Sequence, residues 1–215
     1  MKINERYFRE GWKSWKKEIK EYKYFILISL VIAGIATYAD YIAGTYVSSI
    51  RVADVPDLIL DNIGSYDFGF LFIYGYLALT FLFFFYPIFF HIGKLHKVIG
   101  QFSLLIVIRS FFIIFTHLQT PLDVIHAVFP WPFTGLYFAN DLFFSGHVAV
   151  PFLGFLLYHE SRSMKYLFLL SSIIMGIIVL LMHQHYSIDV FAAFFITYGS
   201  YKIGNFLFKK IKPDF

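Results

Sequence analysis

Two short polar motifs hold the residues best suited to chemistry. Residues 141–147 read Asp-Leu-Phe-Phe-Ser-Gly-His, and residues 183–189 read His-Gln-His-Tyr-Ser-Ile-Asp. Both motifs lie beside long apolar runs, where histidine and carboxylate side chains are costly unless they are used. Two histidines and an aspartate that meet at such a place can supply a nucleophile, an acid and an orienting carboxylate. Together the motifs predict chemistry on a lipid phosphate at a membrane edge.

The second motif pairs a histidine with a carboxylate. His185 and Asp189 have a spacing that puts them on one face of a helix beginning near His185. An aspartate that accepts a hydrogen bond from one imidazole nitrogen fixes the tautomer and leaves the other nitrogen free to attack phosphorus. The product would be a phosphohistidine. The alternative is structural, with Asp189 or Ser187 capping the start of the helix.

The first motif combines a possible anion site with a second histidine. Gly146 lets the backbone approach an anion closely, and amides at a helix N-terminus favour phosphate oxygens. His147 would then be placed to protonate a departing alkoxide. Ser145-Gly146-His147 is a short motif, so an interfacial histidine without a chemical role is the alternative.

Arg109 is a third candidate for the site, because it lies within an apolar stretch that contains no acidic residue. An unpaired arginine in hydrocarbon is costly, so its side chain should face the bundle interior and a partner. A phosphate could be that partner through bidentate hydrogen bonds. An ion pair with Asp141 or Asp40 is the alternative, and burial cost alone does not separate the two.

The composition places the chain in a membrane. Of 215 residues, 59% are hydrophobic and 15% charged, against roughly 25% charged in an average soluble domain. The 29 phenylalanines are more than a water-soluble core of this size could bury. Because the chain has no cysteine, disulfides, thiolate nucleophiles and cysteine-ligated zinc are excluded. No nucleic-acid-binding motif is present, so no nucleic-acid partner is expected.

Six stretches have about the length and apolarity of a spanning helix, which needs roughly 20 residues. They are 24 to about 46, 68–90, 102–118, 143–158, 166–182 and 188–208. We therefore expect an all-α, integral membrane six-helix bundle, with residues 24–215 forming a single domain. The first stretch must continue past Asp40 or end short.

Residues 1–23 carry an apolar stripe at helical spacing surrounded by Lys and Arg. The stripe consists of Phe8, Trp12, Trp15, Ile19 and Tyr22. This pattern predicts an amphipathic helix in the cytoplasmic interface, and a plain basic flank is the alternative.

The basic residues predict the topology of the bundle. With six spans, sixteen of the 18 Lys and Arg residues fall on the side that carries both termini. Cytoplasmic loops carry the excess of Lys and Arg, so both termini should be cytoplasmic. His147, His185 and Asp189 then lie together near the non-cytoplasmic face.

Three blocks, residues 109–118, 141–147 and 185–190, resemble the sphingomyelin synthase family in order and spacing. That family is a branch of the type-2 phosphatidic acid phosphatase superfamily, and the resemblance covers roughly residues 100–205. It implies a six-helix membrane enzyme with His185 as nucleophile, Asp189 as its orienting carboxylate and His147 as the acid. It implies no metal ion and no cofactor.

Family members move a phospho-headgroup from a glycerophospholipid to a lipid hydroxyl, typically that of ceramide, and release diacylglycerol. The expected partners are therefore a phospholipid donor and a lipid acceptor. The residues expected to bind the phosphate and head group are Arg109, Asp141, Ser145, Gly146, His183 and Tyr186.

The sequence also departs from the family pattern. Ala139-Asn140 stand where the family has Cys-Gly, and Gln119 follows Leu118 where the family has proline. These changes leave the head group and the acceptor open. A lipid phosphate phosphatase, in which water replaces the acceptor, is the first alternative function. A non-catalytic lipid-binding or transport protein is the second, because a fold does not guarantee an activity.

Overall fold

The computed structural model describes residues 2–50, 52–131, 134 and 138–211, with side chains from residue 11 to residue 210 of these ranges. The described residues form α-helices and short 3₁₀ and π turns, without a strand. The expected all-α class is therefore confirmed. The helices are α1 (Lys2–Ser48), α2 (Tyr76–Phe90), α3 (Leu95–Phe115), α4 (Gly146–Leu157), α5 (Arg162–Leu181) and α6 (Ser187–Ile211).

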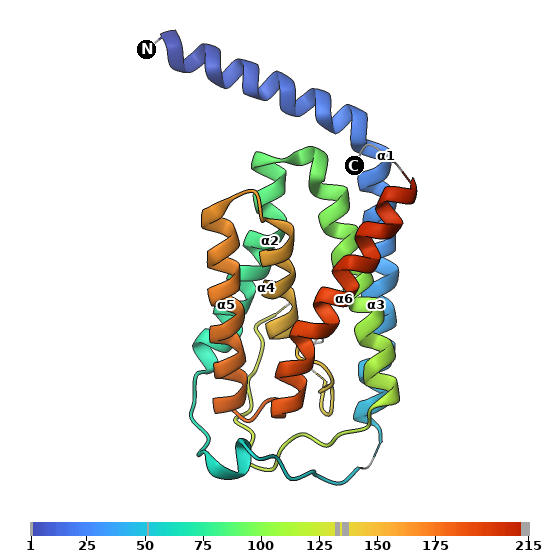
Figure 1. Ribbon diagram of the computed structural model, residues 1–215, viewed down its shortest axis with the longest axis vertical. Helices are drawn as coiled ribbons and strands as arrows, with labels where there is room; N and C mark the ends of the chain where they lie inside the picture. Colours follow the sequence, from blue (N-terminus) through green and yellow to red (C-terminus); the bar gives the residue numbers. More distant parts are fainter. Residues whose placement is uncertain (1, 51, 132–133, 135–137, 212–215) are drawn as a thin grey trace.

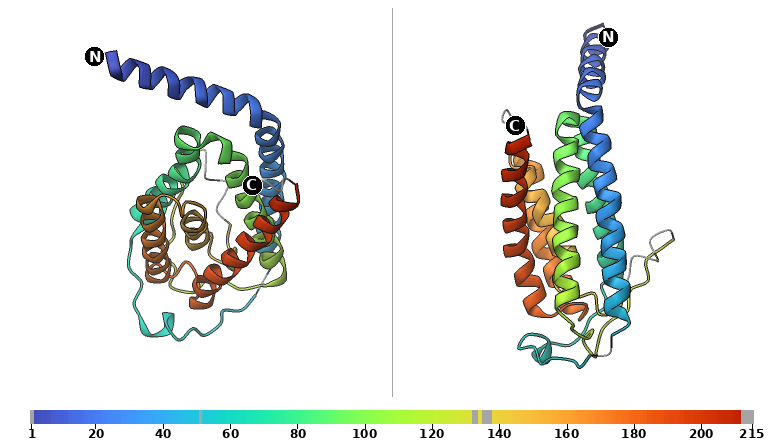
Figure 2. Two further views of the ribbon diagram at one scale, coloured as in Figure 1. Left: turned by 45° about the horizontal axis from the view of Figure 1, so that its top comes forward. Right: turned by 90° about the vertical axis from the view of Figure 1, so that its right-hand side faces the viewer.

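The helices run alternately up and down, so that both termini lie at one end of the bundle (Figures 1 and 2). A π-helical turn, Leu71–Gly75, leads into α2, and a 3₁₀ turn, Ile92–Lys94, joins α2 to α3. Helix α1 packs mainly along α3, whereas α4 contacts α5 and α6. Long connections before α2 and before α4 cover the end of the bundle opposite the termini (Figure 1).

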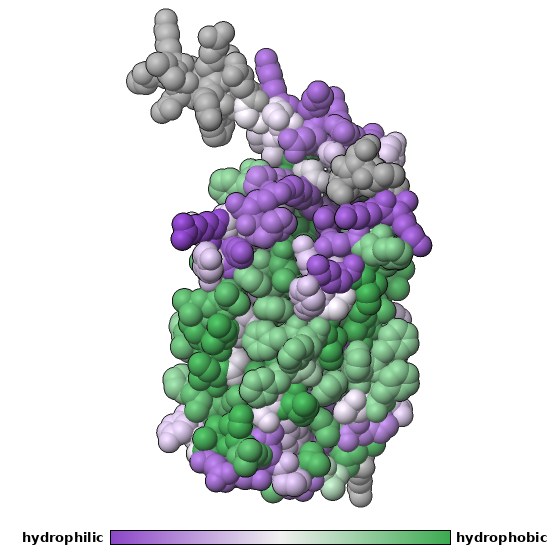
Figure 3. Space-filling model, viewed as in Figure 1, coloured by the Kyte–Doolittle hydropathy of each residue, from purple (hydrophilic) through white to green (hydrophobic). Residues whose placement is uncertain are grey.

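Four segments are long and apolar enough to cross a membrane: Gly11–Ser48, Leu71–Phe90, Ile92–Phe115 and Arg162–Leu181. On the face shown in Figure 3, apolar side chains form a belt across the bundle, and polar residues collect beyond it, most densely at the end with the termini. These features identify an integral membrane protein. The 12 residues of α4 span about 18 Å, less than the roughly 30 Å of a bilayer core. By length and composition the structure thus supports four spans, and the six-span count stays a prediction.

Helix α1 differs from the predicted division at residue 23. It is continuous from Lys2 to Ser48, passes Asp40, and bends so that its first part leaves the bundle (Figures 1 and 2). Trp15 Nε1 donates a hydrogen bond to the Ile88 carbonyl at 2.7 Å, and Ile19 packs against the α2–α3 turn. This part of the apolar stripe therefore covers protein. The side chain of Phe8 lies outside the described residues, and the interfacial helix stays a prediction.

Helix α3 begins seven residues before the predicted Phe102, because polar groups near its start have partners inside the bundle. Gln101 is fully buried and donates through Nε2 to the Tyr201 carbonyl at 3.2 Å and to Asn205 Oδ1 at 3.1 Å. A buried amide is tolerated when it is hydrogen-bonded. A prediction from apolar residues alone therefore places the start of the helix too late.

Candidate active site

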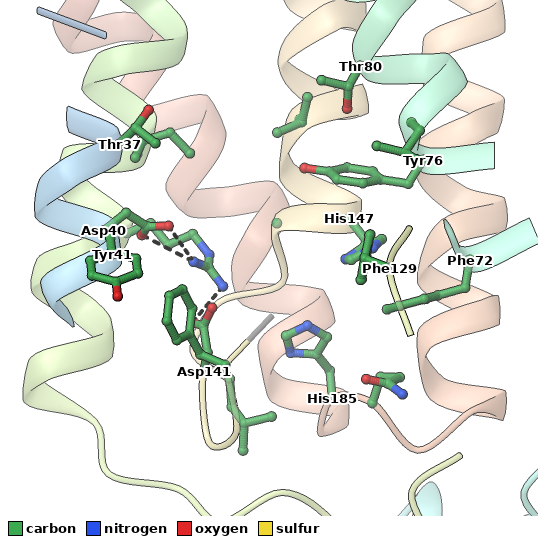
Figure 4. A pocket seen from close by; sticks show the side chains of 18 of the residues that line it. Thr37, Asp40, Tyr41, Phe72, Tyr76, Thr80, Phe129, Asp141, His147 and His185 are labelled. Carbon is green, nitrogen blue, oxygen red and sulfur yellow. Dashed lines mark hydrogen bonds and ion pairs between the residues drawn. The ribbon is translucent and has the colours of Figure 1, made fainter. Parts of the chain in front are cut away.

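A cavity of about 270 Å³ lies among α1, α2, α3, the start of α4 and the turn before α6. Both predicted catalytic histidines, His147 and His185, line it, as do Arg109, Asp141 and Gly146. Most of the remaining wall is apolar or aromatic. Figure 4 shows the two imidazoles close to one another on one side of the cavity and the charged cluster of Asp40 and Asp141 on the other. The fold thus brings together groups from both sequence motifs.

His185 and Asp189 form the expected pair. Their Nδ1 and Oδ2 atoms are 3.4 Å apart, and the Asp189 side chain is fully buried behind the histidine. This separation exceeds the usual hydrogen-bond range of about 2.7–3.2 Å, but catalytic hydrogen bonds are often long without substrate. Asp189 Oδ2 also accepts the Tyr186 backbone N–H at 3.0 Å. The same carboxylate therefore caps the helix and faces the imidazole. A capping role for Asp189 is thus compatible with a role in orienting His185.

His147 is held between two aromatic rings at the start of α4. Its ring stacks on Phe72 at 4.0 Å between centroids and lies 4.1 Å from the ring of Tyr76. Its Nε2 atom is buried and has no hydrogen-bond partner in the described part of the chain. An imidazole nitrogen that is fixed in place beside a cavity and not used by the protein is available for proton transfer to a substrate.

Arg109 joins three separate segments. Its Nη2 atom lies 2.7 Å from Asp141 Oδ1, and its Nη1 atom lies 3.2 Å from Asp40 Oδ1. Its Nε atom donates to the Phe144 carbonyl at 3.1 Å. The guanidinium thus ties α3 to α1 and to the segment that leads into His147. Figure 4 marks the contacts at Asp40 and Asp141 with dashed lines. The structure shows the ion-pair alternative for Arg109, and contact with phosphate stays a prediction.

Three of the predicted binding residues lie outside the cavity wall. Ser145 is fully buried, and its backbone N–H donates to the Asp189 carbonyl at 3.3 Å. His183 is buried with a φ of 50°, a left-handed conformation that is uncommon for a residue other than glycine. The Tyr186 hydroxyl donates to the Gln119 carbonyl at 2.9 Å. In this structure these residues shape the turns that carry His147 and His185.

Asp57 supports the structure around the candidate site, although the sequence did not single it out. It lies in the loop between α1 and α2, is buried, and accepts the backbone N–H of Ser187 at 2.7 Å and the Ser187 hydroxyl at 2.8 Å. It also accepts the N–H groups of Ile59 and Leu60. Asp57 therefore caps α6 from a distant loop, directly after His185-Tyr186. No local pattern could reveal this contact, because its partners are 130 positions apart.

The loop of Asp57 is also joined to the site by apolar packing. A buried apolar cluster joins three segments. It contains Leu60 from the loop of Asp57, Leu142 from the segment before His147, and Tyr186, which follows His185. Burial opposes the charged form of Asp57, but the hydrogen bonds from Leu60, Ser187 and Ile59 outweigh it and lower the pKa of this carboxyl. Asp57 is therefore stabilised as the carboxylate that caps α6.

We expect Asp57→Ala to lower the free energy of unfolding by about 2 kcal/mol, through loss of the cap and of the buried hydrogen bonds. Because the folded state lowers this pKa, the stabilisation is present above the ordinary carboxyl range and is lost as pH falls below it. Thermal unfolding in detergent across acidic pH measures both effects. Asp54→Ala, in an exposed part of the same loop, is the control. Equal unfolding curves for the two variants would contradict the role of Asp57.

Among the described residues, no group of three or more His, Asp or Glu side chains is arranged to hold a metal ion. The chemical groups that the cavity offers are two imidazoles, a guanidinium, two carboxylates and the N-terminus of α4. This set can support nucleophilic attack and proton transfer at a phosphate ester.

Comparison with known proteins finds one similarity, in a segment toward the C-terminal end of the chain. None of the curated proteins matches the sequence. A family model described as PAP2 superfamily C-terminal matches residues 139–205, a segment that contains His147, His185 and Asp189 but not Arg109. This match is a similarity to the type-2 phosphatidic acid phosphatase superfamily that supports phosphatase or phosphotransferase chemistry on lipids, and it points to no particular branch.

Proposed function

We propose that the protein is a membrane phosphotransferase similar to sphingomyelin synthase, which moves a phospho-headgroup from a glycerophospholipid to a lipid hydroxyl such as that of ceramide. The observation that carries this proposal is the meeting of His147 and His185 in one cavity, with Asp189 buried behind His185. The resemblance of residues 109–118, 141–147 and 185–190 to that family favours transfer to a lipid over hydrolysis.

In the first half of the reaction, the free nitrogen of His185 attacks the phosphorus of the donor. The bond between phosphorus and the diacylglycerol oxygen breaks as the new nitrogen–phosphorus bond forms. His147 gives its proton to the departing oxygen, so that diacylglycerol leaves as the neutral alcohol. Asp189 faces Nδ1 of His185 and stabilises the positive charge that develops on the imidazole.

In the second half, His147 is neutral and accepts the proton of the acceptor hydroxyl. The acceptor oxygen attacks the phosphohistidine, the nitrogen–phosphorus bond breaks, and His185 returns to its starting state. Donor and acceptor therefore use the same two histidines in opposite order. If water enters in place of the acceptor, the same steps give a lipid phosphate phosphatase.

The charge on the phosphate oxygens needs stabilisation in both halves. Residues Gly146 and His147 begin α4, and a helix N-terminus presents free N–H groups and a positive dipole end to an anion. A Cβ atom added at Gly146 would lie 3.6 Å from Arg109 Nε, at ordinary van der Waals contact, so the start of α4 lies directly beside the guanidinium. Arg109 and the first amides of α4 are therefore proposed to face the phosphate.

The proposed topology has both termini in the cytoplasm and the cavity toward the opposite face. The excess of Lys and Arg at the end with the termini supports it. In this arrangement α4 and α6 complete six spans with the four long apolar helices, and the donor would come from the outer leaflet.

Lipid mass spectrometry on the purified protein in liposomes tests the proposed activity. The liposomes contain mixed phospholipids with or without ceramide and diacylglycerol, beside a His185→Ala control. We expect a new phosphorylated lipid that requires the acceptor and is absent with the variant. Release of free phosphate without dependence on an acceptor would establish the phosphatase instead. Identical lipids from both proteins under every mixture would favour a non-catalytic lipid-binding or transport protein.

A further inference from the structure

A second hollow, of about 340 Å³, lies between α3 and α6 at the end of the bundle that carries the termini. It shares no residue with the cavity of the two histidines. Its lining consists of Lys97, Lys202, Asn205, Phe206, Phe208 and Lys209. The mechanism proposed above uses none of these side chains.

The polar side chains of this hollow can offer it four N–H donor groups. Lys97, Lys202 and Lys209 bring ammonium groups, and no carboxylate lines the hollow. None of the three lysines forms an ion pair with another described residue. The carbonyl oxygen of Asn205 accepts a hydrogen bond from Gln101 Nε2 at 3.1 Å, which leaves the amide NH₂ group for another partner.

Buried contacts hold one member of this donor set, Asn205, in place. Gln101 is fully buried and binds both Asn205 and the Tyr201 carbonyl. At Gly204 the two helices approach so closely that an added Cβ atom would lie 2.3 Å from Gln101 Oε1. The orientation of Asn205 is thus fixed by the packing of α3 against α6, not by surface side chains alone.

The hollow also has an apolar side that faces lipid. Phe206 is 58% exposed beside the lysines, and Phe208 packs over Gly100. Lysines near the ends of membrane helices extend their ammonium groups toward the interface. Like charges gathered in one place repel one another, and an anion between them removes that repulsion. The combination of clustered N–H donors with an exposed aromatic wall fits a ligand with a negative head and apolar chains.

We propose that this hollow binds the phosphate of an anionic phospholipid, in the leaflet on the side of the chain termini. Lys97, Lys202, Lys209 and the Asn205 amide contact the phosphate, and the acyl chains pass Phe206 into the apolar belt. Basic pockets between membrane helices are known to bind such head groups. The site is separate from the active site, so the lipid it holds is not a substrate in place for the histidines.

Native mass spectrometry of the purified full chain in detergent tests this site, with phosphatidylglycerol and phosphatidylcholine as the two probes. We expect tighter binding of phosphatidylglycerol, and loss of this preference in Lys97→Gln/Lys202→Gln/Lys209→Gln, with about a fivefold change for each lysine removed. Lys13→Gln/Lys17→Gln/Lys20→Gln removes the same charge from an exposed part of α1 and should keep the preference. Asn205→Leu keeps every charge and should weaken binding about tenfold.

Two results would overturn the proposal. One is equal binding of the two lipids by the unchanged protein. The other is an equal loss of the preference for phosphatidylglycerol in the variant with three lysines replaced in α1 and in the variant with the three lysines of the hollow replaced. Inorganic phosphate is added as a competitor to separate a free anion from a lipid. Displacement by inorganic phosphate alone, at concentrations similar to those of the lipid, would also overturn the assignment to a phospholipid. If the Lys→Gln variant does not fold, the variant with Lys→Arg at positions 97, 202 and 209 is measured in its place. It preserves the three positive charges and should retain the preference for phosphatidylglycerol.

Discussion

Replacement of His185 by alanine is expected to lower turnover at least about 10⁴-fold, because removal of the attacking group from a nucleophile–base unit costs about that much or more. The side chain lines the cavity, and its Nδ1 atom lies 3.4 Å from Asp189 Oδ2, beyond the usual hydrogen-bond range. The loss should therefore appear in kcat while the protein still folds. Phosphate transfer from donor lipid to acceptor, measured with the purified variant in liposomes, gives the rate.

His117→Ala is the matched control for His185→Ala. His117 is an exposed histidine just after α3, and its ring lies in a T-shaped arrangement with Tyr46, 5.8 Å between centroids. It should keep full activity and the same unfolding temperature. A protein that carries the phospho-headgroup on histidine should also be trapped with the unchanged chain after quenching in alkaline denaturant, and it should be absent with His185→Ala. Full activity of the purified His185→Ala protein would show that another group attacks the phosphorus.

The pairing of His185 with Asp189 could be predicted because its geometry is local. His185 and Asp189 are separated by about one helical turn, so a helix that begins near residue 187 brings them together without help from distant segments. His147 could be predicted for a similar reason, since Gly146 and Ser145 indicate the start of a helix at the end of an apolar run. The charge pattern predicted only that both patterns lie near one face of the bundle, and the structure shows that they share one cavity.

The supporting contacts could not be predicted, because they depend on long-range pairing. A buried arginine requires a partner, but the sequence left phosphate, Asp40 and Asp141 open, and the structure shows that both aspartates contact it. Asp57 was one of several acidic residues in a loop, and only the folded chain shows it capping α6. Tyr76 and Phe72 were assigned to an apolar span, and their ring contacts with His147 follow from how α2 and the turn before it pack against α4.

Arg109→Met is expected to lower the free energy of unfolding by about 3 kcal/mol, because breaking a buried ion pair leaves an uncompensated charge. Here the change would leave two carboxylates facing each other in a mostly apolar cavity. The side chains of Arg109, Asp40 and Asp141 are 10%, 23% and 13% exposed, so the loss should lie at the lower end of the range for fully buried pairs. Thermal and chemical unfolding of the purified protein in detergent measures the change.

A combined variant separates the structural role of Arg109 from a role at the phosphate. Arg109→Met/Asp40→Asn/Asp141→Asn removes all three charges, so it should recover most of the lost stability. If the guanidinium also faces the phosphate, this stable variant stays inactive, because no cation is left to offset the charge of the transition state. If activity returns with stability, Arg109 only positions the segment leading to His147. An Arg109→Met protein as stable as the unchanged chain but inactive would instead contradict the structural role, since the carboxylates would then tolerate the loss of their partner.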